Sequence, residues 1–341
     1  MADYKGIKGF KVQSLASDPT LIEGTVWYNT ASAVLKYAAV TPIMSGTWAS
    51  GNAQNTKREQ PGSATAAPMT TATIFGGFSA AEYPPGNVAK TEEYDGTSWT
   101  VSGDLSIGGK TDLEGGGTQT AAVCYGGFPY PGTAETEACE YNGSTWTTVN
   151  SMTTGTANAG AFGTQTAAIC AGQGNPSPNT SCYEYDGTSF STGGSLTVAR
   201  KENIGSGSGT QTAGIITGGN TTTASNVTEG YDGTSWSTQT GSITAPAGLR
   251  SGAMYGTQTI AMFVGGYIGP TYANTNQIYD GTSWTEGADI ANARRACGKG
   301  GGTASAVLAG GAPSSGPVVF GSATEEWSAP TAAVAKTVTS S

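Results

Sequence analysis

Short apolar runs alternate with polar turns along most of this chain, and the pattern predicts strands rather than helices. The run 72–77, Ala-Thr-Ile-Phe-Gly-Gly, ends in a glycine pair and is followed by a polar segment that carries Glu and Tyr. An Asp-Gly turn then leads into a segment that begins with Trp. Asp-Gly accepts the positive φ angles of a tight hairpin. We therefore expect an all-β chain in which this turn joins two antiparallel strands.

The hairpin signature recurs along the chain, and its leading aromatic residues are 44 to 48 positions apart. A period of this length is typical of repeated four-stranded units, in which repeated aromatics pack between neighbouring sheets. We assign a structural role of this kind to Tyr94, Trp99, Tyr141, Trp146, Tyr185, Phe190, Tyr231, Trp236, Tyr279, Trp284, Trp327 and Trp48.

The two ends of the repeat complement each other. Trp327 occupies the first aromatic position of a sixth unit whose second half is missing, whereas residues 45–48, Ser-Gly-Thr-Trp, match that missing half. We expect the N-terminal strand to complete the last unit and to close a six-bladed ring. The alternative has seven blades, with residues 27–37 and Trp48 forming most of the extra one. The predicted domains are an N-terminal attachment segment at 1–43, with a β-hairpin over 25–37, and a β-propeller at 44–341.

The double glycine followed by a spaced Tyr and Trp resembles the kelch family over residues 44 to 330. The resemblance implies a kelch-like β-propeller. Two positions depart from the family pattern: Phe190 replaces a Trp, and Gln173 replaces the second glycine of its pair.

Charge and hydropathy limit the possible partners. The chain has 15 Lys and Arg against 24 Asp and Glu, a net charge of −9, and no basic run, so nucleic-acid binding is not expected. No apolar stretch approaches the roughly 18 residues that span a bilayer, and the first residues lack the apolar core of a signal peptide. We expect neither membrane insertion nor Sec export.

The residue types also argue against catalysis. The 341 residues include no His, which removes Ser-His-Asp and Cys-His chemistry and most zinc sites. The five cysteines cannot all pair and none has metal-ligand spacing, and the Asp-Gly turns lack the ligands of a calcium loop. We therefore expect no enzyme activity, no metal and no cofactor.

Two repeated polar motifs are more consistent with structural roles than with a site. The glutamates before the signature aromatic, Glu93, Glu140, Glu184 and Glu326, could hydrolyse a glycoside only if two flanked one bond, but they recur one unit apart. The Gly-Thr-Gln-Thr motif at 117–120, 163–166, 209–212 and 256–259 could bind a ligand near the channel. For the Gly-Thr-Gln-Thr motif we favour hydrogen bonds to backbone groups between units, and for the glutamates a structural role within the repeated unit.

The units stop resembling one another only in the loops that follow the glycine pairs. These loops contain Tyr, Asn, Ser and Thr with little charge, a composition typical of binding loops, although surface loops also drift toward Pro, Asn and Ser. The candidate ligand-binding residues are Tyr83, Phe128, Tyr130, Asn175, Asn179, Asn220, Tyr267 and Tyr272.

The N-terminal segment carries a second resemblance. Residues 4–10, Tyr-Lys-Gly-Ile-Lys-Gly-Phe, with 24–30 and 35–37, resemble the start of virion structural and tail-fibre proteins of marine bacteriophages, notably those of cyanobacteria. The resemblance implies a virion protein assembled in the host bacterial cytoplasm. Residues 1–43 would then contact other virion proteins, and the propeller loops would bind a host-surface glycan or protein, with glycan favoured. A homo-oligomer on the particle is compatible with this. The alternatives are an architectural capsid-decoration or tail-associated protein and, third, a polysaccharide depolymerase.

Overall fold

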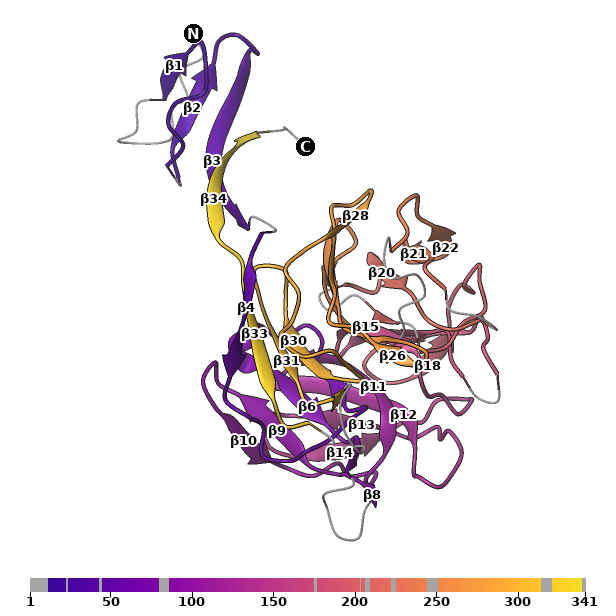
Figure 1. Ribbon diagram of the computed structural model, residues 1–341. Coiled ribbons are helices and arrows are strands. Elements are labelled where there is room, and N and C mark those ends of the chain that lie inside the picture. The colour runs from indigo at the N-terminus through magenta and orange to yellow at the C-terminus, as the bar shows by residue number, and fades with distance from the viewer. Residues whose placement is uncertain are drawn as a thin grey trace. The chain divides into compact units, whose positions relative to one another are not determined.

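The computed structural model describes residues 12–22, 24–42, 45–79, 86–174, 177–202, 204–205, 209–221, 225–243, 251–313 and 321–338 (Figure 1). In this part of the chain the structure is all-β. Its helical content is a single 3-10 turn, η1 (Met69–Thr71), so no described helix could cross a membrane. The chain divides into two units, Met1–Ile43 with Ala329–Ser341, and Met44–Ser328.

The described part of the larger unit forms six four-stranded antiparallel sheets, an arrangement consistent with a β-propeller. The first contains β5 (Gly62–Ser63), β6 (Thr73–Phe75), β9 (Thr91–Tyr94) and β10 (Trp99–Ser102). The second contains β11 (Thr111–Thr118), β12 (Ala121–Phe128), β13 (Ala138–Tyr141) and β14 (Trp146–Val149). The third contains β15 (Gly160–Thr164), β16 (Ala167–Ala171), β17 (Cys182–Tyr185) and β18 (Phe190–Thr192).

The remaining three sheets follow the same plan. The fourth contains β19 (Ile204–Gly205), β20 (Gly214–Thr217), β21 (Thr228–Tyr231) and β22 (Trp236–Thr238). The fifth contains β23 (Ala253–Thr257), β24 (Ile260–Val264), β27 (Asn276–Tyr279) and β28 (Trp284–Glu286). The sixth contains β30 (Gly298–Gly301), β31 (Ser305–Ala309), β33 (Thr324–Ser328) and β4 (Thr47–Gly51). In the last sheet β4 pairs with β33 over five positions, with Trp48 opposite Trp327.

Short two-stranded ribbons extend from some of these sheets. They pair β7 (Phe78–Ser79) with β8 (Gly86–Asn87), β25 (Tyr267–Ile268) with β26 (Thr271–Tyr272), and β29 (Arg294–Arg295) with β32 (Ala312–Pro313).

The predicted Asp-Gly hairpins are confirmed. In the first sheet Tyr94 pairs with Trp99, and between them Gly96 has a φ of +92°. The Asp95 carboxylate accepts hydrogen bonds from the backbone N–H groups of Thr97 and Ser98, both at 2.7 Å. These donors lower the pKa of Asp95, first through Ser98 and then through Thr97. The side chain therefore closes the turn, which explains the requirement for Asp or Asn at this position.

The repeated glutamines join neighbouring sheets, as predicted. The glutamates, for which only a structural role was expected, join neighbouring sheets as well. Tyr141 of the second sheet donates its hydroxyl to Glu93 of the first at 2.6 Å, and Tyr185 donates to Glu140 at 2.9 Å. Gln165 donates to the carbonyl oxygens of Ala122 and Tyr141, each at 2.9 Å. Each unit thus uses its repeated polar groups to satisfy the backbone and phenol groups of its neighbour.

Three buried ion pairs fix the segment before a sheet to the third strand of that sheet. The Arg58 guanidinium lies 2.5 Å from the Glu92 carboxylate, and both side chains are fully buried. Arg58 also donates to the carbonyl oxygens of Gly76 and Lys90. The pairs Arg200–Glu229 and Arg294–Glu325 repeat this arrangement.

The first strands of the six sheets lie against one another in chain order, and β30 lies against β5. Glycine permits this close approach. A Cβ atom on Gly115 of β11 would lie 2.6 Å from the Phe75 ring and 2.7 Å from the Ser63 carbonyl oxygen of the preceding sheet. The glycine-rich composition of these strands therefore follows from their packing.

The smaller unit is a separate four-stranded sheet in the order β1 (Gln13–Leu15), β2 (Val26–Asn29), β3 (Val34–Pro42) and β34 (Thr331–Thr337) (Figure 1). The expected hairpin is present, since β2 and β3 pair from Val26 with Tyr37 to Asn29 with Val34. Residues 329–341, which we had placed with the propeller, fall in this unit because β34 pairs along β3.

Candidate functional site

Six residues at the start of the first strands share an unusual backbone conformation. Each is a non-glycine residue with φ between +52° and +59°, and each lies in or two residues before the first strand of a different sheet. Such angles are costly for an L-residue and are a reason to look for function. We call this set the rim residues: Gln60, Asp112, Asn158, Glu202, Ser251 and Ala296.

Backbone hydrogen bonds join neighbouring rim residues. The Ser251 N–H donates to the Glu202 carbonyl oxygen at 3.0 Å, and the Ala296 N–H donates to that of Ser251 at 2.6 Å. Gln60 donates to Ala296 at 2.8 Å, Asp112 donates to Gln60 at 3.1 Å, and Glu202 donates to Asn158 at 2.7 Å. The left-handed conformation is thus part of how the six sheets connect, and the side chain at each rim position is left free to vary.

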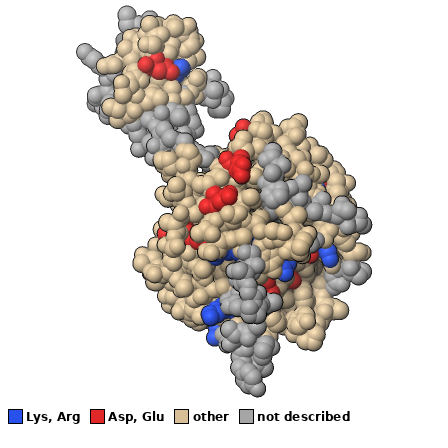
Figure 2. All heavy atoms as spheres, viewed as in Figure 1, with Lys and Arg blue, Asp and Glu red and all other residues tan. Residues whose placement is uncertain are grey.

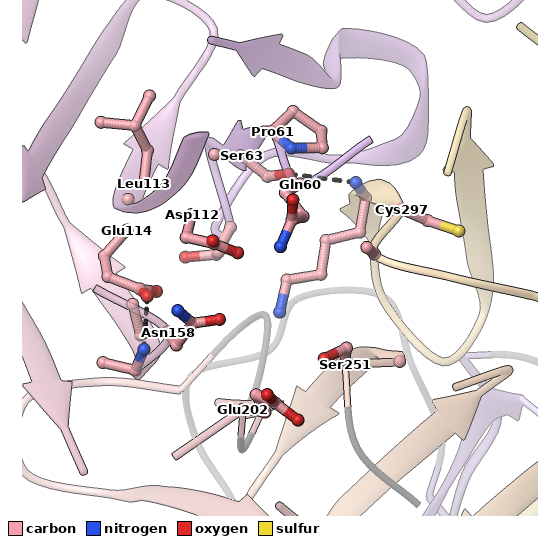
Figure 3. A pocket seen from close by; sticks show the side chains of 18 residues that line it. Gln60, Pro61, Ser63, Asp112, Leu113, Glu114, Asn158, Glu202, Ser251 and Cys297 are labelled. Atoms are coloured by element: carbon pink, nitrogen blue, oxygen red, sulfur yellow. Dashed lines mark hydrogen bonds between the residues drawn. The ribbon is translucent and has the colours of Figure 1, made fainter. Parts of the chain in front are cut away.

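The rim residues surround a cavity of about 110 Å³ to which all six sheets contribute. We call it the shared pocket. Figure 3 shows Asp112, Glu114 and Asn158 gathered on one side of this space, with Glu202 and Ser251 on the other. The Glu114 carboxylate accepts a 2.6 Å hydrogen bond from the Ala159 N–H. The volume holds several water molecules or one small polar ligand.

The shared pocket lies at the loop end of the sheets. Thr111, next to Asp112, pairs with Phe128, where β12 runs into its variable loop. In the third and fifth sheets, likewise, Gly160 pairs with Ala171 and Ala253 pairs with Val264. The pocket and the variable loops therefore occupy one end of the repeats, opposite the Asp-Gly turns.

Ionisable groups in the shared pocket have perturbed pKa values. Burial raises the pKa of Glu114 to about 8, against the effect of the Ala159 N–H. Burial, followed by the nearby carboxylates of Glu202 and Glu59, raises the pKa of Asp112 to about 7. Burial also lowers the pKa of Lys299 to about 8, although Glu114 opposes this. Perturbed groups of this kind, gathered in a cavity, are typical of functional sites.

A buried hydroxyl completes the polar lining. Thr65 lines the pocket and is only 3% exposed. Within the part of the chain that the structure describes, its Oγ1 has no hydrogen-bond partner. A buried hydroxyl without a partner costs free energy, so a ligand or water is the expected partner.

Of the predicted loop residues, Tyr83 and Asn175 fall outside the described residues, and none of the other six lines the shared pocket. Phe128 is half-buried at the end of β12, and Tyr130 is 61% exposed, with its ring edge-on to Phe78 at 5.4 Å. Asn179 and Asn220 are half-buried and form backbone bridges with Arg200 and Lys201 respectively. These four residues belong to three separate loops, since Phe128 and Tyr130 share the loop that follows β12.

Tyr267 and Tyr272 are brought together. Their rings meet edge to face across the β25–β26 ribbon, with centroids 5.5 Å apart and an interplanar angle of 66°. The Arg295 guanidinium lies 5.0 Å from the first centroid and 5.6 Å from the second, a cation–π arrangement. Arg295 immediately precedes the rim residue Ala296, so this aromatic pair holds the chain next to the shared pocket.

The rim residues and Glu114, Lys299 and Thr65 were not predicted as site residues. A usable signal was present: charged residues are only 11% of the chain, yet Asp112, Glu114 and Lys299 interrupt glycine-rich first strands. Within the described ranges, no group of three or more His, Cys, Asp or Glu side chains could hold a metal ion.

Neither a protein-family model nor a curated protein matches this sequence. Among solved structures, the chain is similar to the structure of YjhT, with a TM-score of 0.65 and 14% sequence identity. The similarity covers 80% of this chain and 95% of that one. At this identity the likeness concerns the fold alone.

Proposed function

We propose that residues 44–328 form a six-bladed, kelch-like β-propeller that β4 closes. Contacts between the sixth and first sheets support closure: Tyr94 donates its hydroxyl to Glu326, and the Trp99 indole N–H donates to Thr324 at 3.0 Å. The contact of β30 with β5 supports it further. The seven-bladed alternative is disfavoured because the β2–β3 hairpin pairs with β34 in a separate sheet.

We propose further that the protein is a non-enzymatic bacteriophage virion component, of the tail-fibre or fibre-type appendage class, that binds carbohydrate on the host surface. The shared pocket is the observation that carries this function. Carboxylate, amide and hydroxyl side chains line the pocket from five of the six repeats, and the sixth adds the Lys299 ammonium group. These are groups that exchange hydrogen bonds with sugar hydroxyls. Its place at the loop end allows the variable loops to contact the rest of a glycan chain.

The surface around the repeats fits a hydrophilic, weakly charged partner. Figure 2 shows charged side chains scattered singly or in small groups among neutral ones on the face in view. Such a surface favours recognition by hydrogen bonding and stacking over binding of a polyanion.

The smaller unit supplies the attachment in this proposal. Eight large apolar side chains are exposed among the described residues, and six of them belong to this unit: Val12, Ile22, Val26, Tyr28, Tyr37 and Val338. Exposed apolar groups concentrated on a small sheet are typical of a protein-binding surface. We assign this surface to other virion proteins, which agrees with the resemblance of the N-terminal segment to those of tail-fibre proteins.

The test is glycan-array and host-cell binding by the purified full chain, together with competition against phage adsorption. We expect binding that Asn158→Gly weakens, since Gly keeps the positive φ and removes the amide from the pocket. Thr97→Ala, in an exposed turn at the opposite end of the sheets, is the matched control and should bind normally.

Absence of glycan binding, together with unchanged phage adsorption in the presence of excess protein, would overturn the proposed function. A particle reconstruction with the loop end buried against neighbouring subunits would favour the architectural alternative instead.

A further inference from the structure

We propose that Cys124 and Cys139 are a site of covalent modification, at which an oxidant joins the two thiols in a disulfide. The bond would link β12 to β13 at the base of the variable loop 129–137, which contains Tyr130. The inference follows from the strand register, from the contact between the two sulfur atoms and from the placement of the other cysteines.

The register places the two cysteines directly opposite each other. Cys124 on β12 pairs with Cys139 on the antiparallel strand β13. Cα atoms of opposite residues in such a pair lie about 4.5–5.5 Å apart, within the range of about 4.4–6.8 Å that a disulfide spans. Both side chains belong to one core cluster, so they leave the sheet on the same face. The strand pairing therefore already provides the backbone separation that the bond requires.

The two thiols are in contact. Their Sγ atoms are 2.6 Å apart, compared with about 2.05 Å in a disulfide. Both residues are fully buried and both thiols are free in this structure. In this reduced form one thiol can donate a weak hydrogen bond to the other. Oxidation would replace that contact by a covalent bond between the same two atoms.

The other three cysteines lack a partner of this kind. Cys182 pairs with Ala171, the residue after Cys170, so the Cys170 and Cys182 side chains point to opposite faces of the third sheet. They accordingly belong to different core clusters. The Cys297 thiol donates to the Gly310 carbonyl oxygen at 3.5 Å. The structure describes all five cysteines, and the proposed pair is the one whose thiols it brings together.

Thiol–disulfide exchange supplies the chemistry, with a small-molecule disulfide as the oxidant. One cysteine thiol loses its proton, and its thiolate attacks the small disulfide, forms a mixed disulfide and releases one small thiolate. The second cysteine thiolate then attacks the protein sulfur of the mixed disulfide, which forms the Cys124–Cys139 bond and releases the second small thiolate. The small disulfide thus gains two electrons, and its two halves take up the two protons.

Burial controls when this exchange can occur. It raises the pKa of the Cys124 thiol well above its ordinary value, and the Cys139 thiol adds to this effect. Exchange needs a thiolate that the oxidant can reach, so it should proceed through transient opening of these strands. Once the strands close again, the same burial protects the new bond from reductants.

The bond would hold the variable loop at its base. The two cysteines are 15 positions apart, and the segment between them contains the whole loop. Lys110 already contacts this loop through the carboxylates of Glu135 and Glu137. Closing so short a segment restricts the unfolded chain, so the oxidised protein should resist unfolding better than the reduced protein.

Disulfide mapping of the full chain tests the inference. The reduced chain is incubated with oxidised glutathione at about pH 8, slightly below its unfolding temperature, so that the strands open transiently. It is then denatured with a thiol-alkylating reagent, digested and analysed by mass spectrometry. We expect a peptide pair linked through Cys124 and Cys139 in most molecules, with Cys170, Cys182 and Cys297 alkylated. The oxidised chain should unfold about 5 °C above the reduced chain.

Two variants separate the bond from general effects of oxidation. Cys139→Ala should lose both the link and the difference in unfolding temperature between its oxidised and reduced forms. Cys182→Ala, also buried and on the third strand of its sheet, should keep both. Each variant is compared with its own reduced form, and the peptide map of the unsubstituted chain decides the linkage if Cys139→Ala does not fold.

The proposal would be overturned by alkylation of both Cys124 and Cys139, by glutathione retained on either, or by a link through another cysteine in most molecules. These readouts do not involve carbohydrate, so their failure would leave the proposed function unaffected, and failure of glycan binding would leave this inference unaffected.

Discussion

The two ends of the sheets repeat in different ways. At the turn end the side chains repeat, and they make the same contacts in successive units: Asp95 and Asp186 each cap a turn, and Tyr141 and Tyr185 each bond the preceding sheet. At the rim positions of the other end only the backbone repeats, since the six rim residues share φ but are six different residue types. Side chains that repeat thus serve packing between the sheets. Positions that repeat only in backbone conformation allow each sheet to present a different side chain to the shared pocket.

The comparison predicts the largest loss of stability for a change in the repeated framework. Replacing Arg58 by Met leaves the Glu92 carboxylate buried without its counter-charge. We expect the free energy of unfolding to fall by about 3–5 kcal/mol, measured by urea denaturation.

Lys36→Met is the matched control, because it breaks the Lys36–Asp18 ion pair, whose side chains are 20% and 34% exposed. That pair should contribute below about 1 kcal/mol. Equal effects of the two substitutions would show that burial does not set the strength of the framework pairs.

A substitution in the shared pocket should raise the free energy of unfolding, whereas a substitution in the framework lowers it. The pKa of Glu114 lies at about 8, above its ordinary value near 4.5, so the folded state holds this proton more tightly than the unfolded state. The contribution of Glu114 to the stability of the native chain therefore decreases as the pH rises from about 4.5 to about 8. Glu114→Gln does not titrate, and we expect it to be more stable by about 2–4 kcal/mol at pH 9 but not at pH 4.

Unfolding midpoints across this pH range check the prediction. An unchanged difference between variant and native chain at pH 4 and pH 9 would contradict it. A gain of stability that accompanies a loss of carbohydrate binding would indicate that the pocket is maintained for function rather than for folding.

The framework could be predicted from sequence because its contacts are local and repeated. Asp-Gly fixes a turn within four residues, and the glutamates that precede Tyr recur at the same place in several units, so their structural role could be inferred. The positions of Trp48 and Trp327 likewise matched the two halves of one signature, and β4 pairs with β33.

The shared pocket could not be predicted in the same way, because it forms only when six distant segments meet. Gln60 and Ala296 are 236 residues apart in the chain and are joined by one backbone hydrogen bond. Positive φ at a residue such as Glu202 leaves no mark in the residue type. The variable loops lie at the same end of the sheets as the shared pocket, but aromatic residues in them pack locally, as Tyr267 and Tyr272 do around Arg295.

Removing one repeated hydrogen bond should have an intermediate effect. Tyr141→Phe deletes the hydroxyl that donates to Glu93 at 2.6 Å and contacts Ser102, and it leaves the buried ring in place. We expect a loss of about 1–2 kcal/mol by urea denaturation. Tyr130→Phe, at a ring 61% exposed, is the control and should be neutral. Similar losses for the two would mean that the hydroxyl does not couple the sheets.

The smallest effects on stability should distinguish the positive φ of glycines in the signature turns from the positive φ of the rim residues. Gly143 lies in a signature turn and has a φ of +93°. An added Cβ would meet no atom closer than 3.4 Å, so Gly143→Ala should lower the free energy of unfolding by about 1 kcal/mol through the backbone conformation alone.

Ala296, at a φ of +57°, already bears such a cost, and Ala296→Gly should stabilise the fold by about 0.5 kcal/mol. Thermal and urea unfolding of both variants give the signs. Destabilisation by Ala296→Gly would show that the rim conformation is held without strain, and the positive φ at the pocket would then reflect only the connection between sheets. The expected gain would instead support a rim that is kept strained in order to present side chains to the pocket.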